Sequence, residues 1–470
     1  MHSFHYRDGR LHCEDVDLAR VAREFGTPLY VYSAETILDH YRRLDAALPD
    51  LDHLICYAVK ANSTRAILKL LAQAGAGFDI VSGGELFRVL AAGGDAARCT
   101  FAGVGKSLEE IEYALGQCVY SFNVESEAEL ECIDRIAGAK NLRARIALRA
   151  NPDVDPHTHE YISTGSRENK FGIALDQIAA VYERAAKMRN IDIVGVQMHI
   201  GSQIIETQPF VDAIKKIAPL VLELKAKYEI EFFSIGGGVG IVYESSFLSG
   251  SKDWWDSSTS SPQDESVRLA DESTRKEQRT NQLSIQRYVD AILPPLRELK
   301  LRILLEPGRL LVGNAGVLLT RIRYIKRTGQ KKFAIVDAGM NDLIRPSLYH
   351  SFHEIVPVEE PSKSSPQDES VRLADKSKNT EKIDIVGPVC ETGDFFALDR
   401  EMPEVRDGDL LAIMSAGAYG FVMASNYNSR PLPAEALVRG DKFALICKRQ
   451  TWEDLIRNEV EPIRSDGVME

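Results

Sequence analysis

The chain has 470 residues, of which 44% are hydrophobic, so it can bury a large core and form more than one domain. Its formal net charge of −12 at pH 7 comes without a basic stripe, which argues against a nucleic acid or an anionic membrane as its main partner. It has neither an apolar run of about eighteen residues nor a signal-peptide core, so we expect a cytoplasmic protein that is not exported.

The seven cysteines show no spacing typical of a disulfide frame or of a zinc site, so we expect reduced thiols and no bound metal. They are Cys13, Cys56, Cys99, Cys118, Cys132, Cys390 and Cys447. Taken by their spacing alone, most of them are expected to fill the core.

Between residues 30 and 310, short β-branched or apolar runs alternate with amphipathic stretches whose apolar residues recur at three- and four-residue intervals. The eight runs cover residues 53–61, 78–82, 98–103, 119–126, 143–151, 193–202, 232–238 and 302–309. Eight strands that are each followed by a helix predict an α/β fold, a (β/α)8 TIM-type barrel. The alternative is an open doubly wound sheet, which would place its glycine-rich phosphate loop after the first strand. Here the triple glycine follows the seventh.

After residue 310 the pattern changes to period-two strands separated by turn residues, which predicts a mainly β domain over residues 311–470. Residues 1–29 hold one or two short strands that we expect to join this β domain. Two polar segments, 249–284 in the barrel and 360–381 in the β domain, share the string SSPQDESVRLAD and are expected to be mobile surface loops. One explanation of the repeated string is a short element inserted twice into surface loops, where long insertions cost little stability. The alternative is a docking motif.

The run LICYAVKANS, residues 54–63, places Lys60 at the polar end of a buried strand. Most lysines in such positions only keep their ammonium in water while the stem packs on apolar surface. The alternative is covalent chemistry, because a partly desolvated amine loses its proton more easily and then attacks carbonyls. The other strand ends decide between the two.

In a barrel of this kind the active site lies at the carboxyl ends of the strands, and phosphates commonly bind after strands seven and eight. These strand ends carry Lys60, Asp79, Arg149, His199, Ser202, Gly236, Gly237, Gly238, Glu306 and Arg309. A nucleophilic amine, a glycine cradle for an anion, a planar histidine and a buried acid indicate pyridoxal 5'-phosphate as the cofactor. Each residue also has an ordinary structural explanation, but together those explanations need a coincidence at every strand end.

On this hypothesis Lys60 holds the cofactor aldehyde as an imine, while the glycines and Ser202 take the phosphate. His199 stacks on the ring face. Glu306 hydrogen-bonds the pyridine nitrogen and favours its protonation, which makes the ring an electron sink for a carbanion at Cα of a bound amino acid.

Several motifs follow one another in order along the chain: YAVKAN, GFDIVSGGEL, LRANPDVDPHTHEYISTGSRENKFGI, VQMHIGSQI, IGGGVGI, LEPGR, DAGMNDLIRPSLY, VGPVCETGD and SAGAYG. From about residue 27 onward, apart from the two polar segments, the chain resembles the diaminopimelate decarboxylases, which are alanine-racemase-like (fold type III) pyridoxal phosphate enzymes. The resemblance implies a head-to-tail homodimer with active sites at the interface. It also implies conversion of meso-2,6-diaminopimelate to L-lysine and CO2, the last step of bacterial lysine synthesis.

The resemblance, together with the strand ends, also assigns roles to single residues. The expected cofactor-binding residues are Lys60, Asp79, Arg149, His199, Ser202, Gly236, Gly237, Gly238, Glu306 and Tyr419. The expected substrate-binding residues are Arg309, Arg345, Tyr349, Glu391 and Tyr419, and the catalytic ones are Lys60, Cys390 and His199. Both arginines and Tyr349 would grip the carboxylate at the end that does not react. Cys390 and Glu391 would come from the other subunit, as a proton donor near the carbanion and as the partner of the distal ammonium.

The two arginines also favour the substrate class on physical grounds, because ornithine, lysine and arginine end in a cation that buried guanidinium groups would repel. A decarboxylase of a basic amino acid or of a carboxylated polyamine on the same fold is the alternative. A racemase is less favoured because it usually needs a second base. A cofactor-binding protein without activity would lack the substrate arginines and the CETG segment.

Overall fold

The computed structural model describes residues 2–155, 170–244, 246–247, 284–360 and 380–460. The polar segments at 249–284 and 360–381 fall almost wholly outside the described residues, as does the middle of the motif over 148–173. The chain divides into two compact units. The first consists of Met1–Phe4, Ser33–Gly316 and Gly417–Val422, and the second of His5–Tyr32, Val317–Ala416 and Met423–Glu470.

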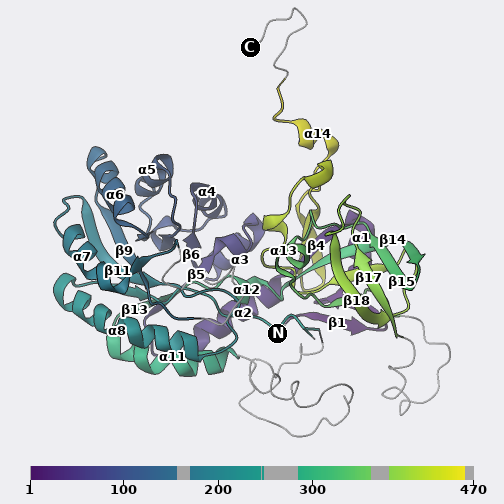
Figure 1. Cartoon of the computed structure of the whole chain (residues 1–470), viewed down its shortest axis with the longest axis horizontal. Helices are drawn as coiled ribbons and strands as arrows, with labels where there is room; N and C mark the ends of the chain where they lie inside the picture. Colours follow the sequence, from purple (N-terminus) through teal and green to yellow (C-terminus); the bar gives the residue numbers. More distant parts are fainter. Residues whose placement is uncertain (1, 156–169, 245, 248–283, 361–379, 461–470) are drawn as a thin grey trace, which may run out of the picture. The chain divides into compact units, whose positions relative to one another are not determined.

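The first unit is built on a closed barrel of parallel strands (Figure 1). In barrel order its strands are β5 (His53–Ala58), β6 (Gly77–Ile80), β7 (Cys99–Phe101), β8 (Ser121–Val124), β9 (Ala144–Asn151), β11 (Ile191–Met198), β12 (Phe232–Ser234) and β13 (Arg302–Leu305). β13 pairs with β5, which closes the sheet, and the short β10 (Ile173–Ala174) pairs with the end of β9. Each predicted run overlaps one barrel strand, so the predicted (β/α)8 barrel is confirmed.

Helices follow the barrel strands along the chain and surround the sheet (Figure 1). They are α3 (Arg65–Gln73), α4 (Gly83–Ala91), α5 (Leu108–Gly116), α6 (Glu127–Ala139), α7 (Leu175–Ala185), α8 (Gln208–Tyr228), α11 (Ile285–Leu299) and the short α12 (Arg309–Val312), and α2 (Ala34–Ala46) precedes the barrel. Ser82, Ser107 and Ser126 each accept a hydrogen bond from the backbone N–H three residues later, which fixes where a strand-to-helix loop ends. Among the described helices, none is long and apolar enough to cross a membrane.

The barrel interior changes from apolar to polar along the strands. One layer is a buried cluster of Leu54, Cys56, Ala147, Val194, Phe232 and Leu304. Side chains two residues apart on a strand share a face. Ser234 lies two residues after Phe232, and Glu306 two residues after Leu304, so polar groups replace the apolar layer toward the carboxyl ends of the strands.

The second unit is mainly β, as predicted. Its larger sheet has the strand order β18-β17-β15-β14-β4-β20-β21, with β19 beside β14 and β16 beside β19. The strands are β4 (Leu29–Ser33), β14 (Gly316–Thr328), β15 (Lys331–Val336), β16 (Ile355–Pro357), β17 (Thr380–Val386), β18 (Phe395–Pro403), β19 (Leu410–Ile413), β20 (Ala434–Arg439) and β21 (Lys442–Cys447). The N-terminal region adds β1 (Phe4–Arg7), β2 (Arg10–Cys13) and β3 (Val16–Asp17), and the helices are α1 (Leu18–Phe25), α13 (Arg345–Tyr349) and α14 (Trp452–Ile456).

Some segments lie in a different unit from the one that the sequence assigned to them. We expected the whole of residues 311–470 to form the β domain, but Gly417–Val422 belongs to the barrel unit. The backbone N–H of Tyr419 donates to the carbonyl of Ala61 across 2.8 Å. These contacts with the end of β5 hold Tyr419 beside the barrel.

Candidate active site

Lys60 lies at the carboxyl end of β5, in the one-turn 3-10 helix η1 (Val59–Ala61). Its Nζ donates a hydrogen bond to Oδ2 of Asp79 across 3.1 Å. Asp79 belongs to the neighbouring β6 and is buried, whereas the Lys60 side chain is 39% exposed. The structure therefore brings together two of the predicted site residues and leaves the lysine accessible to a ligand.

The acidic groups around Lys60 reverse the effect that we expected burial to have on its pKa. Burial alone favours the neutral amine. Here burial is outweighed by Asp79, Tyr419 and Glu306, which raise the pKa of Lys60 above its ordinary value. The neighbouring acids therefore favour the ammonium form of Lys60, the opposite of what burial alone would favour.

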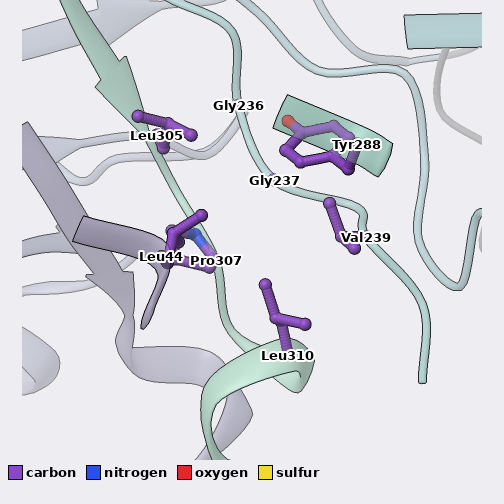
Figure 2. A pocket seen from close by; sticks show the side chains of 8 residues that line it. All are labelled: Leu44, Gly236, Gly237, Val239, Tyr288, Leu305, Pro307 and Leu310. Atoms are coloured by element: carbon purple, nitrogen blue, oxygen red, sulfur yellow. The ribbon is translucent and has the colours of Figure 1, made fainter. Parts of the chain in front are cut away.

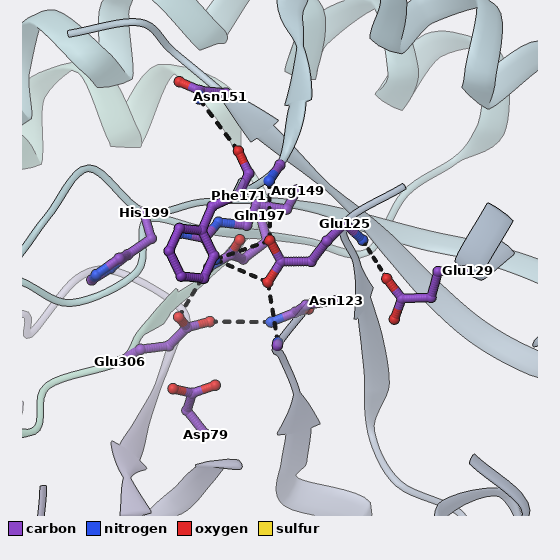
Figure 3. A network of polar contacts seen from close by, with 12 residues as sticks. Asp79, Asn123, Glu125, Glu129, Arg149, Asn151, Phe171, Gln197, His199 and Glu306 are labelled. Carbon is purple, nitrogen blue, oxygen red and sulfur yellow. Dashed lines mark hydrogen bonds and ion pairs between the residues drawn. The ribbon is translucent and has the colours of Figure 1, made fainter. Parts of the chain in front are cut away.

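Glu306 follows β13 directly and is buried in a polar network (Figure 3). Ser234 Oγ donates to Oε1 of Glu306 across 2.6 Å, and Gln197 Nε2 donates to Oε2 across 3.0 Å. Nδ2 of Asn123 makes a longer contact of 3.5 Å with Oε1. Burial and the negative charge of Asp79 raise the pKa of Glu306 to about 7, although its hydrogen bonds act in the opposite direction.

His199 follows β11, and its ring is fixed by a backbone contact. The N–H of Gly237 donates to Nδ1 of His199 across 3.2 Å, so the proton of the neutral ring belongs on Nε2. Burial and the positive charges of Arg149 and Lys60 lower the pKa of His199 well below its ordinary value. The ring is therefore neutral at pH 7, a state suited to packing on an aromatic cofactor.

The three glycines after β12 are required by the close approach of neighbouring strand ends. A Cβ on Gly236 would collide with the carbonyl of Met198, and a Cβ on Gly237 would collide with the carbonyl of Glu306. Gly236 and Gly238 also have positive φ values of +72° and +108°. Backbone packing is thus a second reason for these glycines, beside the anion that their sequence position predicts.

A small cavity lies against two of these glycines (Figure 2). It is lined by Leu44, Gly236, Gly237, Val239, Tyr288, Leu305, Pro307 and Leu310. Because these side chains are mostly apolar, the cavity does not suit a phosphate. An anion bound by the glycines has to approach the loop from another side.

Arg149 at the end of β9 is paired within the protein. Its Nη1 donates to both carboxylate oxygens of Glu125, across 2.9 and 3.1 Å, and both side chains are buried. The guanidinium carbon lies 4.8 Å from the ring centroid of Phe171, and the N–H of Gly172 donates to the same carboxylate (Figure 3). Glu125 thus neutralises the charge that we had assigned to the cofactor, and cofactor binding by Arg149 stays a prediction.

Arg309 is a second buried arginine of the barrel unit. Its Nη2 donates to Ser202 Oγ across 3.2 Å, and its Nη1 donates to the hydroxyl of Tyr243. The guanidinium carbon lies 4.8 Å from the ring centroid of Tyr419. Two residues predicted for the cofactor, Ser202 and Tyr419, therefore contact an arginine predicted for the substrate.

In the second unit, Arg345 begins α13 and is buried. Its Nη2 donates to Ser351 Oγ across 3.2 Å, and its guanidinium carbon lies 5.8 Å from the ring centroid of Tyr349. The two residues predicted to bind the distal carboxylate from this unit are thus neighbours.

Cys390 and Glu391 follow β17 and are both exposed. The backbone N–H of Cys390 donates to Oδ1 of Asn428 across 2.9 Å, and Glu391 accepts a hydrogen bond from the hydroxyl of Tyr427 across 2.9 Å. The exposed thiol of Cys390 does not fit the role of core filler that its spacing alone had indicated.

Comparison with known proteins gives a consistent result. Residues 34–313 match the model of the pyridoxal-dependent decarboxylases, pyridoxal binding domain. The chain is 46% identical to a diaminopimelate decarboxylase from Pseudomonas aeruginosa, over 98% of this chain and 99% of that one. It is 43% identical to the diaminopimelate decarboxylase of Aquifex aeolicus, over 97% of each chain. The chain belongs to the diaminopimelate decarboxylase family.

Solved structures of this family are similar along nearly the whole chain. Diaminopimelate decarboxylase from Helicobacter pylori, complexed with L-lysine, has a TM-score of 0.80 at 38% identity, over 94% of this chain and 99% of that one. The enzyme from M. jannaschii in complex with L-lysine has a TM-score of 0.83 at 34% identity, over 98% of each chain. A lysine decarboxylase from Selenomonas ruminantium is only 21% identical, so its TM-score of 0.70 shows a shared fold and nothing more.

Pyridoxal 5'-phosphate is the cofactor of this decarboxylase family, as predicted, and the barrel residues fit it. Lys60 supplies an amine at a strand end, and His199 supplies a neutral ring. Oδ1 of Asp79 is buried and lacks a hydrogen-bond partner among the described residues, so it can accept a bond from a ligand.

Several residues that shape this decarboxylase site were missed from the sequence. They are Asn123, Glu125, Gln197, Ser234 and Tyr243. Three of them interrupt apolar strands, as in the runs SFNV, IDIVGVQM and FFS. A lone polar residue inside a barrel strand was the available signal, because it has to face a partner in the interior.

Replacing Gly237 by Ala should weaken cofactor binding, because the new methyl group would push the carbonyl of Glu306 away. Overpacking of this kind costs about 1–3 kcal/mol. Urea unfolding and titration with pyridoxal 5'-phosphate measure both effects. Gly105→Ala is the matched control because nothing lies within 4 Å of its Cβ position. Equal stability and cofactor affinity in the two variants would contradict the packing role.

Replacing Asp79 by Asn should lower the pKa of Lys60, because the strongest source of the raised value is removed. Since only the neutral amine attacks an aldehyde, the pH midpoint for capture of pyridoxal 5'-phosphate by the cofactor-free chain should fall by about one to three units. Asp39→Asn on the surface of α2 is the control. A midpoint that stays unchanged or rises in Asp79→Asn would show that Asp79 does not hold the ammonium.

Proposed function

We propose that this chain decarboxylates meso-2,6-diaminopimelate to L-lysine and CO2, the last step of lysine biosynthesis. The observation that carries the proposal is the buried Arg309, which is held by Ser202 and Tyr243 beside Tyr419 in the cofactor-binding barrel. A buried guanidinium suits a substrate with a second carboxylate. Full-length relatives with the same printed activity support it.

The barrel residues bind and orient the cofactor. Pyridoxal 5'-phosphate, when bound, draws electrons from Cα of the substrate as CO2 leaves. Lys60 binds its aldehyde, and Asp79 keeps the lysine side chain in place. His199 packs as a neutral ring on the cofactor, and Glu306 accepts a hydrogen bond from the pyridine nitrogen. The glycines, Ser202 and Tyr419 bind the phosphate.

The substrate is held at the end that does not react. Arg309, Arg345 and Tyr349 bind the distal carboxylate, and Glu391 pairs with the distal ammonium. Cys390 holds the proton that replaces CO2 at Cα. A basic amino acid, the alternative substrate, would leave the buried guanidinium groups without an anion and would be repelled by them.

We also infer a head-to-tail homodimer in the cytoplasm, in which Cys390 and Glu391 act in the site of the second subunit. Both residues are exposed in the described part of their own chain, so they are accessible to another subunit. The free thiols agree with a reducing compartment.

Replacing Arg345 by Ala should reduce kcat/KM for meso-2,6-diaminopimelate by about 30-fold or more, because a buried charged partner of the substrate is lost. The absorbance of bound pyridoxal 5'-phosphate should persist, which separates substrate binding from cofactor binding. Arg439→Ala, at an exposed arginine of the same unit, is the matched control. Unchanged turnover in Arg345→Ala, with the cofactor bound, would reject the substrate assignment.

A further inference from the structure

The carboxylate of Glu306 faces hydrogen-bond donors on both of its oxygens. Oε1 accepts from the hydroxyl of Ser234. Oε2 accepts from the side-chain amide of Gln197 (Figure 3). Nδ2 of Asn123 points to Oε1 at the longer distance of 3.5 Å. The three donors come from β12, β11 and β8, so strands from across the barrel converge on one carboxyl group.

The side-chain amides of Gln197 and Asn123 both turn their NH2 groups toward Glu306. Their carbonyl oxygens, Oε1 of Gln197 and Oδ1 of Asn123, are buried and have no hydrogen-bond partner within the described parts of the chain. Turning the NH2 groups toward Glu306 leaves these oxygens unsatisfied. An ionised carboxylate only accepts hydrogen bonds, so this arrangement of donors matches the charged form and not the acid.

Some of the other effects on Glu306 raise its pKa and others lower it. Burial and the charge of Asp79 favour the neutral acid, while Lys60 favours the anion. Cys56 on β5 also faces Glu306, and burial raises its pKa well above the ordinary value, so it stays neutral. These opposing effects leave the pKa of Glu306 at about 7, so the loss of one hydrogen bond to the anion shifts the group toward the neutral acid.

We propose that Ser234 and Gln197 are positioning residues that keep Glu306 ionised and directed at the pyridine nitrogen of the cofactor. The inference rests on the proposed function in one respect, the contact between Glu306 and that nitrogen. An ionised Glu306 accepts a hydrogen bond from a protonated pyridine nitrogen, which strengthens the electron sink. A neutral Glu306 would donate instead, and the ring nitrogen would lose its proton.

The ionisation of Glu306 can be measured directly in a chain labelled with ¹³C at glutamate carboxyl groups. We expect Ser234→Ala to raise the pH midpoint of the Glu306 signal by about one to two units, because a hydrogen bond to a charged group is lost. Ser121→Ala is the matched control. It removes a buried hydroxyl from β8 that has no partner among the described residues, and its midpoint should equal that of the native chain.

Kinetics of the holoenzyme give an independent readout. With Glu306 mostly neutral at pH 7, kcat of Ser234→Ala should fall by about 10- to 100-fold with little change in KM. The deficit should persist as the pH rises, because losing the proton that Glu306 and the ring nitrogen share leaves that nitrogen neutral. Ser234→Thr keeps the hydroxyl and should restore both the midpoint and kcat.

An unchanged kcat, or a Glu306 midpoint that does not move in Ser234→Ala, would overturn the proposal. If Ser234→Ala does not fold, Gln197→Met tests the same point and should also raise the midpoint. The titration repeated on the cofactor-free chain separates this inference from the assigned reaction. A shift there would support the positioning role even if meso-2,6-diaminopimelate were not decarboxylated.

Discussion

Closure of the eight-stranded barrel is the constraint on which the rest of the site depends. Because all strands are parallel, the residues that follow them meet at one end of the barrel. The apolar layer of Phe232 and Leu304 fills the interior, and Ser234 and Glu306 stand two residues beyond it. Side chains two residues apart on a strand share a face, so the strands that supply the core also place polar groups at the cofactor-binding end.

The charges in this interior depend on one another. Asp79 and Glu306 are buried acids that share the single ammonium of Lys60, so the pKa of Lys60 rises although burial opposes it. The negative charge of Asp79 in turn raises the pKa of Glu306. Hydrogen bonds from Ser234 and Gln197 act against this rise and lower the pKa of Glu306. The site is thus tuned by several strands at once.

Periodicity predicted the barrel strands, because each strand and helix is a local pattern with a period of two or 3.6. The strand order also predicted that Lys60, Asp79 and Glu306 lie near one another, because each of them stands at the carboxyl end of a parallel barrel strand. Local patterns could not predict the donors around Glu306 or the pairing of Arg149 with Glu125, because partners on different strands are set by register and packing. The direction of the Lys60 pKa could not be predicted for the same reason, since it follows from neighbours in space.

The central claim is that this barrel decarboxylates an amino acid with a second carboxylate. CO2 release by the purified chain with pyridoxal 5'-phosphate tests it most directly, with meso-2,6-diaminopimelate, L-ornithine, L-lysine and L-arginine as separate substrates and Lys60→Ala as the control. The account predicts release from diaminopimelate alone and none from Lys60→Ala. Release from a basic amino acid would contradict the roles given to Arg309 and Arg345.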